Sequence, residues 1–128
     1  MVINSKAFEA VLNKYLKRSP HRANAVKSYL QLKRYMELGL PIPEAFNAHP
    51  SNRNRCFWLA HLIKPNSDLL VIYVKYNTKQ GFAVYEFKAV TNHNGLDDCL
   101  QALRLNRLNL LIDDAELQLL KNQSIVLD

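Results

Sequence analysis

Three consecutive runs of β-branched and aromatic residues constrain the fold of this chain most strongly. They span residues 55–63, 68–76 and 82–90, and the connections between them, KPNS and NTKQG, are short and turn-like. Runs of this composition predict strands. Connections this short join neighbouring strands into antiparallel pairs. The sequence therefore predicts a three-stranded antiparallel meander in which the middle strand, 68–76, is the most buried.

Two helices are predicted before the meander. The first has Ser5 as its N-cap, and the second starts at Ser19-Pro20 and ends at Gly39. Each has one apolar face at helical spacing, formed by Phe8, Val11, Leu12, Tyr15 and Leu16 in the first and by Ala25, Tyr29, Leu32 and Met36 in the second. Together they predict a helical hairpin.

The segment after Gly95 is dense in leucine. Asp97 or Asp98 is expected to cap one helix and Asp113 a second, shorter one. The leucines are expected to cover the open face of the sheet, a partner-binding segment being the other interpretation; they are Leu100, Leu103, Leu108, Leu110 and Leu111. The predicted fold class is α+β: an N-terminal helical hairpin packed on a small antiparallel β-sheet, with a leucine-rich C-terminal helical segment.

The length of 128 residues predicts one domain, 1–128, and the net charge of +6 lies mostly in its first half. Residues 1–65 hold 11 Lys and Arg against 3 acids, whereas residues 66–128 hold 6 against 8. This surplus favours nucleic acid, although a solvated helix face or an anionic protein partner fits it too. The apolar runs are too short to span a bilayer and the N-terminus lacks a signal-peptide layout, so we expect a cytoplasmic protein with no membrane partner.

The two cysteines do not predict a redox or metal site. Cys56 and Cys99 lie far apart and lack the spacing of either kind of motif, so two free thiols are expected. A zinc site built from His49, Cys56, His61 and His93 would match no compact metal motif. We expect no metal and no other cofactor.

Three polar residues are predicted to meet at one edge of the meander. His61 lies near the end of the first strand, Asp68 opens the second and His93 follows the third, and these three points share one edge of an antiparallel sheet. His49 precedes the other end of the first strand, yet residues 50–54 reach roughly 16 Å if extended. Taken singly, each histidine also fits a hydrogen-bonded structural role.

Such a cluster suits one reaction in particular. Histidine titrates near neutrality, so a pair supplies one base and one acid at the same pH, as cleavage of RNA by the 2′-hydroxyl requires. Nearby cations such as Lys64 or Lys88 would stabilise the extra negative charge on phosphorus.

Three motifs occur in order along the chain: LPIPEAFNAHP, AHLIKPNSDLLVIY and VTNHNGL. The ordered set resembles the YafQ branch of the RelE superfamily of type II toxin–antitoxin toxins, over roughly residues 5–96. The resemblance implies a RelE-like core with a helical hairpin packed on an antiparallel sheet, and a C-terminal extension, 97–128, without a family counterpart. It also implies a ribosome-dependent endoribonuclease, an mRNA interferase, neutralised by a cognate antitoxin protein.

The resemblance assigns positions as well. His49, His61, Asp68 and His93 fall on the family's active-site positions, with His93 at that of the general acid. The chain departs from the family at several others: Leu59 replaces an acid, Asn66 and Ser67 are inserted before Asp68, and Ala89, beside Lys88, replaces an arginine. The aromatic residue expected shortly after the last histidine is absent.

The sequence thus predicts a toxin that cleaves mRNA on the ribosome by metal-independent acid–base catalysis, with His49, His61, Asp68 and His93 as catalytic residues. The expected RNA-binding residues are basic: Lys14, Lys17, Arg18, Lys33, Arg34, Arg53, Arg55, Lys64 and Lys88. Two other functions fit the same features. One is a non-catalytic superfamily member that inhibits a protein target such as DNA gyrase, and the other is a nucleic-acid-binding module whose histidines contact phosphates.

Overall fold

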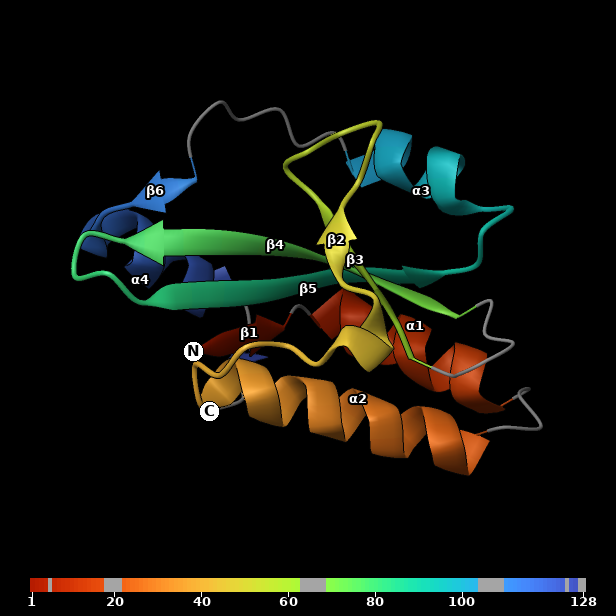
Figure 1. Cartoon of the computed structure of the whole chain (residues 1–128). Helices are drawn as coiled ribbons and strands as arrows, with labels where there is room; N and C mark the ends of the chain where they lie inside the picture. The colour runs from red at the N-terminus through yellow and green to blue at the C-terminus, as the bar shows by residue number, and fades with distance from the viewer. Residues whose placement is uncertain (5, 18–21, 63–68, 104–109, 124, 127–128) are drawn as a thin grey trace.

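A computed structural model of the chain describes residues 1–4, 6–17, 22–62, 69–103, 110–123 and 125–126. Helices and strands are combined in a mixed α+β fold, as predicted, with helices on either side of one sheet (Figure 1). The predicted N-cap Ser5, the helix start at Ser19-Pro20 and the residues Arg18, Lys64, Asp68 and Leu108 lie outside the described residues.

The predicted meander forms the centre of the sheet. Its strands are β3 (Trp58–His61), β4 (Leu70–Thr78) and β5 (Ala83–Thr91), and β4 pairs antiparallel with both of the others. All of β4 except Lys75 and Asn77 is buried, which confirms it as the most buried strand. Central position and burial on both faces account for its nearly continuous apolar sequence.

Four short strands were not predicted: β1 (Val2–Asn4), β2 (His49–Pro50), β6 (Leu111–Ile112) and β7 (Ile125–Val126). The sheet runs in the order β2-β3-β4-β5-β1-β7, with β6 paired to β4. The chain therefore begins with a strand and not with a helix. The sheet is also mixed, because β1 lies parallel to β5 and β6 parallel to β4. Segments of two or three residues are too short to show a periodic pattern.

The two predicted N-terminal helices are α1 (Lys6–Lys17) and α2 (Arg22–Glu37). The buried face of α2 consists of Ala25, Tyr29, Leu32 and Met36, as predicted. On α1, Phe8 and Leu12 are buried, but Val11 is 36% exposed, so the apolar face is narrower than predicted. None of the helices among the described residues is long and apolar enough to cross a bilayer.

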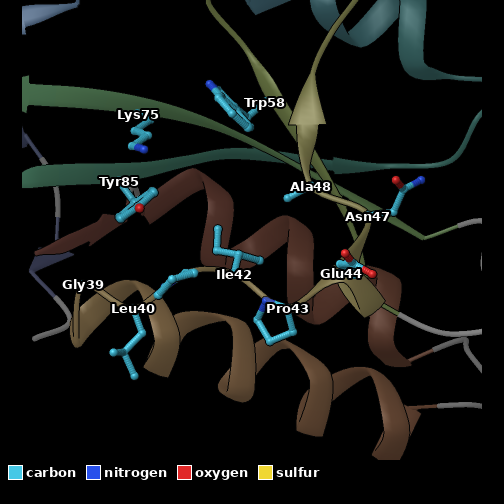
Figure 2. Close-up of a pocket in the computed structure, with 11 residues that line it drawn as sticks. Gly39, Leu40, Ile42, Pro43, Glu44, Asn47, Ala48, Trp58, Lys75 and Tyr85 are labelled. Carbon is cyan, nitrogen blue, oxygen red and sulfur yellow. The ribbon is translucent and has the colours of Figure 1, made fainter.

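The segment from Gly39 to Ala48 crosses beneath the end of the sheet that carries Trp58, Lys75 and Tyr85 (Figure 2). Gly39 has φ +66°, and the N–H of the next residue donates to the Tyr35 carbonyl at 3.0 Å, so α2 ends in a left-handed glycine cap, as predicted. This segment was predicted to be a loop throughout. It contains a 3-10 turn, η1 (Glu44–Phe46), and β2, whose Pro50 is tolerated because β2 is an edge strand.

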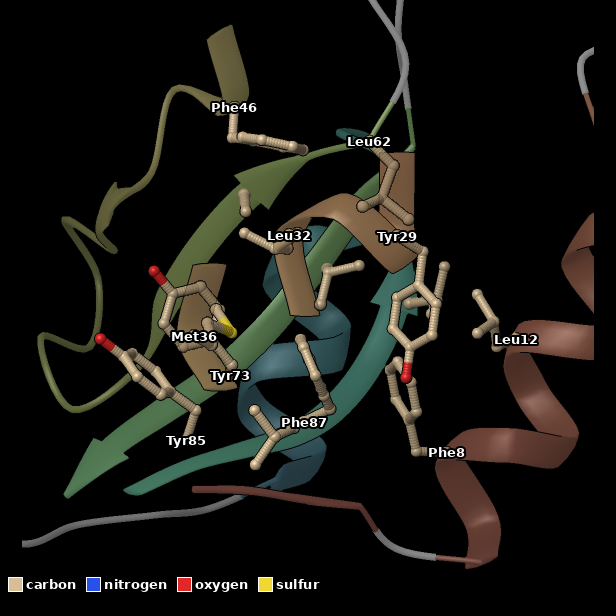
Figure 3. Close-up of a cluster of buried hydrophobic side chains, with 14 of the residues drawn as sticks. Phe8, Leu12, Tyr29, Leu32, Met36, Phe46, Leu62, Tyr73, Tyr85 and Phe87 are labelled. Carbon is tan, nitrogen blue, oxygen red and sulfur yellow. The ribbon is translucent and has the colours of Figure 1, made fainter. Parts of the chain in front are cut away.

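One hydrophobic cluster joins α1 and α2 to the sheet (Figure 3). Phe8 stacks on Phe87 at 5.3 Å between ring centroids, and Tyr29 lies 5.4 Å from the same ring. Tyr73, from the central strand, meets Phe87 edge-on at 6.3 Å. Because these rings come from four separate elements, they fix the helical hairpin against one face of the sheet.

A second cluster covers the other face. It joins Ile72 and Val74 of β4 to residues of the C-terminal segment, which forms α3 (Leu96–Leu103) and α4 (Asp114–Gln123). Leu100 is buried in this cluster, and Leu103 and Leu110 pack against it, as predicted. Leu111 is 46% exposed, so for this residue the prediction is wrong. The strand β6 alternates, and its inward residue is Ile112.

Of the helix caps predicted for α3 and α4, only the one for α4 is confirmed. Asp113 precedes α4 and its carboxylate accepts the Glu116 N–H at 2.8 Å, as predicted for an N-cap. Asp97 and Asp98 lie inside the first turn of α3 and do not cap it. Acids in this position still favour the helix, because they face its positive end.

Neighbouring residues of β6 allow a matched test of this second cluster. Ile112→Ala is expected to destabilise the protein by about 2–5 kcal/mol, because Ile112 is 1% exposed and its removal leaves a cavity. Leu111→Ala is expected to change stability by less than about 0.5 kcal/mol. Urea unfolding of both variants measures the difference. Equal effects would show that the C-terminal segment is not part of the core.

Candidate functional site

The short strand β2 places His49 beside His61. His49 pairs with Leu59 of β3, and His61 lies two residues further along β3, hence on the same face. The two imidazole rings are 6.2 Å apart between centroids and inclined by 26°. Sequence alone left the position of His49 open, and the pairing of β2 with β3 determines it.

His93 follows the end of β5 and lies beside His61. Thr91, near the end of β5, pairs with Leu70, and Leu70 pairs with His61. The His93 ring lies 5.5 Å from that of His61, so His61 is the middle of three neighbouring rings. The prediction that His61 and His93 meet at one edge of the sheet is confirmed.

The three histidines line one cleft of about 390 Å³, which we call the histidine cleft. Asn47, Ser51, Asn52 and Arg53 line it from the β2 side, and Leu96 and Asp97 from the start of α3. Leu59 and Leu70 supply the apolar wall. Leu59 belongs to the cluster on the side of the sheet opposite the helical hairpin, and Leu70 shares that face because it lies two residues from Ile72 on β4. No described residue of α1 or α2 lines the cleft.

The backbone fixes the tautomer of His49. Its Nδ1 lies 2.7 Å from the Asn47 carbonyl oxygen, which can only accept a hydrogen bond, so Nδ1 carries the proton. The carbonyl is turned toward the ring by the left-handed conformation of Asn47, φ +46°. In neutral His49 the free electron pair is therefore on Nε2, which is available to accept a proton.

A compact turn carries His93. The Asn92 side chain accepts the Gly95 N–H at 2.7 Å, and the Leu96 N–H donates to the His93 carbonyl at 3.4 Å. A Cβ on Gly95 would lie 2.8 Å from the Thr91 hydroxyl oxygen, so any larger residue would require the Thr91 side chain to shift. The sequence TNHNG thus forms a short, self-bonded link between β5 and α3 that presents the exposed His93 ring to the cleft.

An ion pair crosses the rim of the cleft. Arg53 Nε lies 2.9 Å from Asp97 Oδ1, with the side chains 70% and 49% exposed. Ser51 holds the loop that carries Arg53: its buried hydroxyl accepts the N–H groups of Arg53 and Asn54 at 3.2 and 3.4 Å. Arg53 was predicted to bind RNA, whereas Asp97 was considered only as a helix cap.

The other predicted cations lie elsewhere. Lys14 and Lys17 are exposed on α1, and on α2 the Arg34 guanidinium lies 3.6 Å from Glu37. Arg55 and Lys88 do not line the histidine cleft. Lys88, the bulge residue of β5, lies 3.0 Å from the buried carboxylate of Glu86, which also accepts the Tyr76 hydroxyl at 3.1 Å. Among the predicted cations that the structure describes, Arg53 is therefore the one that lines the histidine cleft.

The zinc alternative has no geometric support among the described residues. No group of three or more His, Cys, Asp or Glu side chains in that part of the chain is arranged to hold a metal ion. Cys56 does not line the cleft, and neither cysteine of the described chain is in a disulfide. Burial raises the pKa of the Cys99 thiol, which disfavours its thiolate form.

Sequence reasoning missed Asn47, Ser51 and Asp97 as residues of the site. A signal existed for Ser51, because the stretch HPSNRN is rich in residues that bond to their own backbone.

Comparison of the chain with protein-family models, with curated proteins and with solved structures finds no match in any of the three. The chemistry of the cleft therefore rests on its own groups: three imidazoles, a guanidinium and the carboxylate that pairs with it.

Proposed function

We propose that the protein is an endoribonuclease that cleaves mRNA on the ribosome, the toxin of a toxin–antitoxin pair. The observation that supports this most strongly is the row of three imidazole rings, 6.2 and 5.5 Å apart, in one cleft with a guanidinium at its rim. The helical hairpin against the meander also fits the RelE-like arrangement that the sequence motifs imply, with β1 added before it.

The proposed reaction needs two proton transfers. One histidine removes the proton of the RNA 2′-hydroxyl as its oxygen bonds to phosphorus. A second, protonated histidine gives a proton to the 5′-oxygen as the bond from phosphorus to that oxygen breaks. The products are a 2′,3′-cyclic phosphate and a free 5′-hydroxyl. Water is not consumed in this step, and imidazoles alone supply both transfers, so the proposal involves no metal.

The geometry suggests a role for each ring. His49 is the base, because its Nε2 is free to accept a proton while Nδ1 is held by the Asn47 carbonyl. His93 is the general acid, at the position that has this role in the resembling family, and its exposed ring can reach the leaving oxygen. His61, between them, is near enough to both to contact the phosphate.

Arg53 is the proposed partner of the developing negative charge. A guanidinium binds phosphate through two parallel N–H groups, and its attraction strengthens as charge accumulates in the transition state. Leu59, which stands where the family has an acid, lines the cleft and adds no repelling carboxylate. The carboxylate of Asp97 is bound to Arg53 and must give way to the phosphate.

His93→Ala is expected to lower the rate of RNA cleavage by about 10²- to 10⁴-fold, the usual effect of removing a general acid. Stability should be unchanged, because His93 is exposed. Single-turnover cleavage of ribosome-bound message, with mass spectrometry of the RNA ends, measures the rate and identifies the cyclic phosphate.

Asn94→Ala is the matched control for His93→Ala, since Asn94 is an exposed neighbour in the same turn. It should retain parental activity. Cleavage by the His93→Ala protein at the parental rate would show that His93 is not the general acid. If the parental protein cleaves no message, with or without ribosomes, the proposed function is wrong.

Asp97→Asn is expected to tighten binding of a short single-stranded RNA by about two- to fivefold, because it releases Arg53 from an exposed ion pair of about 0.2–1 kcal/mol. Asp98→Asn is the control, with the same change of charge in the same helical turn. Fluorescence anisotropy at low salt gives both affinities. An equal gain in the two variants would show a general charge effect, and weaker binding by Asp97→Asn would show that the ion pair maintains the cleft.

The basic face of α1 is proposed to bind ribosomal RNA without taking part in the reaction. Lys14→Glu with Lys17→Glu should weaken ribosome association and reduce the dependence of affinity on salt, with a slope lower by about 0.7–0.9 for each phosphate that the helix no longer binds. The same reversal at Lys79 and Lys121 is the control. Sedimentation with ribosomes over a salt series measures this, and salt-insensitive binding by the parental protein would indicate a protein target.

A further inference from the structure

A second cavity, of about 740 Å³, lies between the sheet and the segment that follows α2 (Figure 2). We call it the aromatic cavity. Trp58, Lys75 and Tyr85 line it from three adjacent strands, and the residues from Gly39 to Glu44 line it from the opposite side. It opens on the face of the sheet that carries the helical hairpin, and the proposed reaction does not use it.

Two aromatic rings in this cavity face the same ammonium group. Lys75 Nζ lies 5.9 Å from the centroid of the Trp58 ring and 6.0 Å from that of the Tyr85 ring. Burial raises the pKa of the Tyr85 hydroxyl, so this ring is uncharged at neutral pH. The cavity therefore combines the partly exposed Trp58 ring with a positive charge, and the buried Tyr85 ring lies beside them.

A charged side chain is unusual at this place in β4. Lys75 lies on β4 among residues that are nearly all buried, on the side of the sheet covered by the hydrophobic cluster of α1 and α2. No carboxylate of the described residues forms an ion pair with it, although Glu44 lines the same cavity. The ammonium group lies over two uncharged rings, so no described residue neutralises its charge, which can attract an anionic ligand.

The aromatic cavity adjoins the histidine cleft. Asn47 lines both, at the point where the chain enters β2. The two cavities thus lie on opposite faces of the β2–β3 edge and share one residue. A single extended strand of nucleic acid that passed over this edge would contact both.

We propose that the aromatic cavity binds an unstacked nucleobase of single-stranded RNA, with Lys75 on the adjoining phosphate. The inference rests on the proposed function, since it places a nucleotide flanking the one in the histidine cleft. Aromatic rings combined with a cation are the usual means of holding single-stranded nucleic acid without reading its sequence. A cationic side chain of a protein partner is disfavoured, because Lys75 repels it.

The chain contains a single tryptophan, Trp58, so its fluorescence reports on this cavity directly. The probe is a short single-stranded RNA whose riboses carry 2′-O-methyl groups, which prevents cleavage. Saturable quenching is expected. Removing one base at a time from the probe should weaken binding by about five- to 150-fold at a single position, as loss of one stacked base predicts.

Lys75→Gln should weaken the same binding, whereas Lys79→Gln, an equal change of charge on the exposed turn after β4, should not. Equal affinity of all the abasic probes, or equal effects of the two lysine variants, would overturn the proposal. So would binding of the probe without quenching, or quenching by a purified protein partner and not by RNA. Circular dichroism checks that both variants are folded.

The His93→Ala protein separates this inference from the proposed function. It should still show base-dependent quenching while cleaving message about 10²- to 10⁴-fold more slowly than the parental protein. If RNA quenches the Trp58 fluorescence of the parental protein but the protein cleaves no message, the aromatic cavity is supported as a nucleic-acid site and the proposed reaction is wrong. If it cleaves but shows no base-dependent quenching, only the aromatic cavity has been misassigned.

Discussion

Burial of β4 on both faces is the constraint on which the rest of the structure depends. A strand that is apolar on both sides needs a layer of cover above and below. The rings of Phe8 and Tyr29 supply one layer and the C-terminal residues around Leu100 the other. With β4 held in this way, β3 and β5 are fixed in register, so that His61 and Thr91 lie on either side of Leu70. The histidine cleft is thus located by a strand that contributes no histidine to it.

Elements with a long, regular pattern are predictable from this sequence. The three strands of the meander, the buried face of α2 and its glycine cap at Gly39 each combine several residues into one signal. The convergence of His61 and His93 follows from the meander, because antiparallel strands with short turns place those ends together. The α+β class and one pair of the site could therefore be obtained without coordinates.

The remainder of the site depends on contacts that leave no local pattern. His49 is positioned by β2, a strand of two residues that includes a proline. Which of the predicted cations lies at the cleft depends on contacts between distant segments. Lys88 forms an ion pair with Glu86, two residues away in the sequence. No pattern in the sequence predicts that Glu86 is buried. Arg53 meets Asp97 across the cleft, although the two are far apart in sequence, and only the packing of α3 brings them together.

The position of β1 has a consequence for the order in which the sheet is assembled during synthesis. β1 lies between β5 and β7, and the carbonyl of Met1, just before it, accepts the Tyr85 N–H at 3.0 Å. Residues 2–4 therefore lack their partners until residues near 85, and then residues 125–126, have been synthesised. Contacts between residues so far apart in sequence form late and slowly. A nascent chain that lacks residues 125–126 therefore holds β1 without its full set of partners.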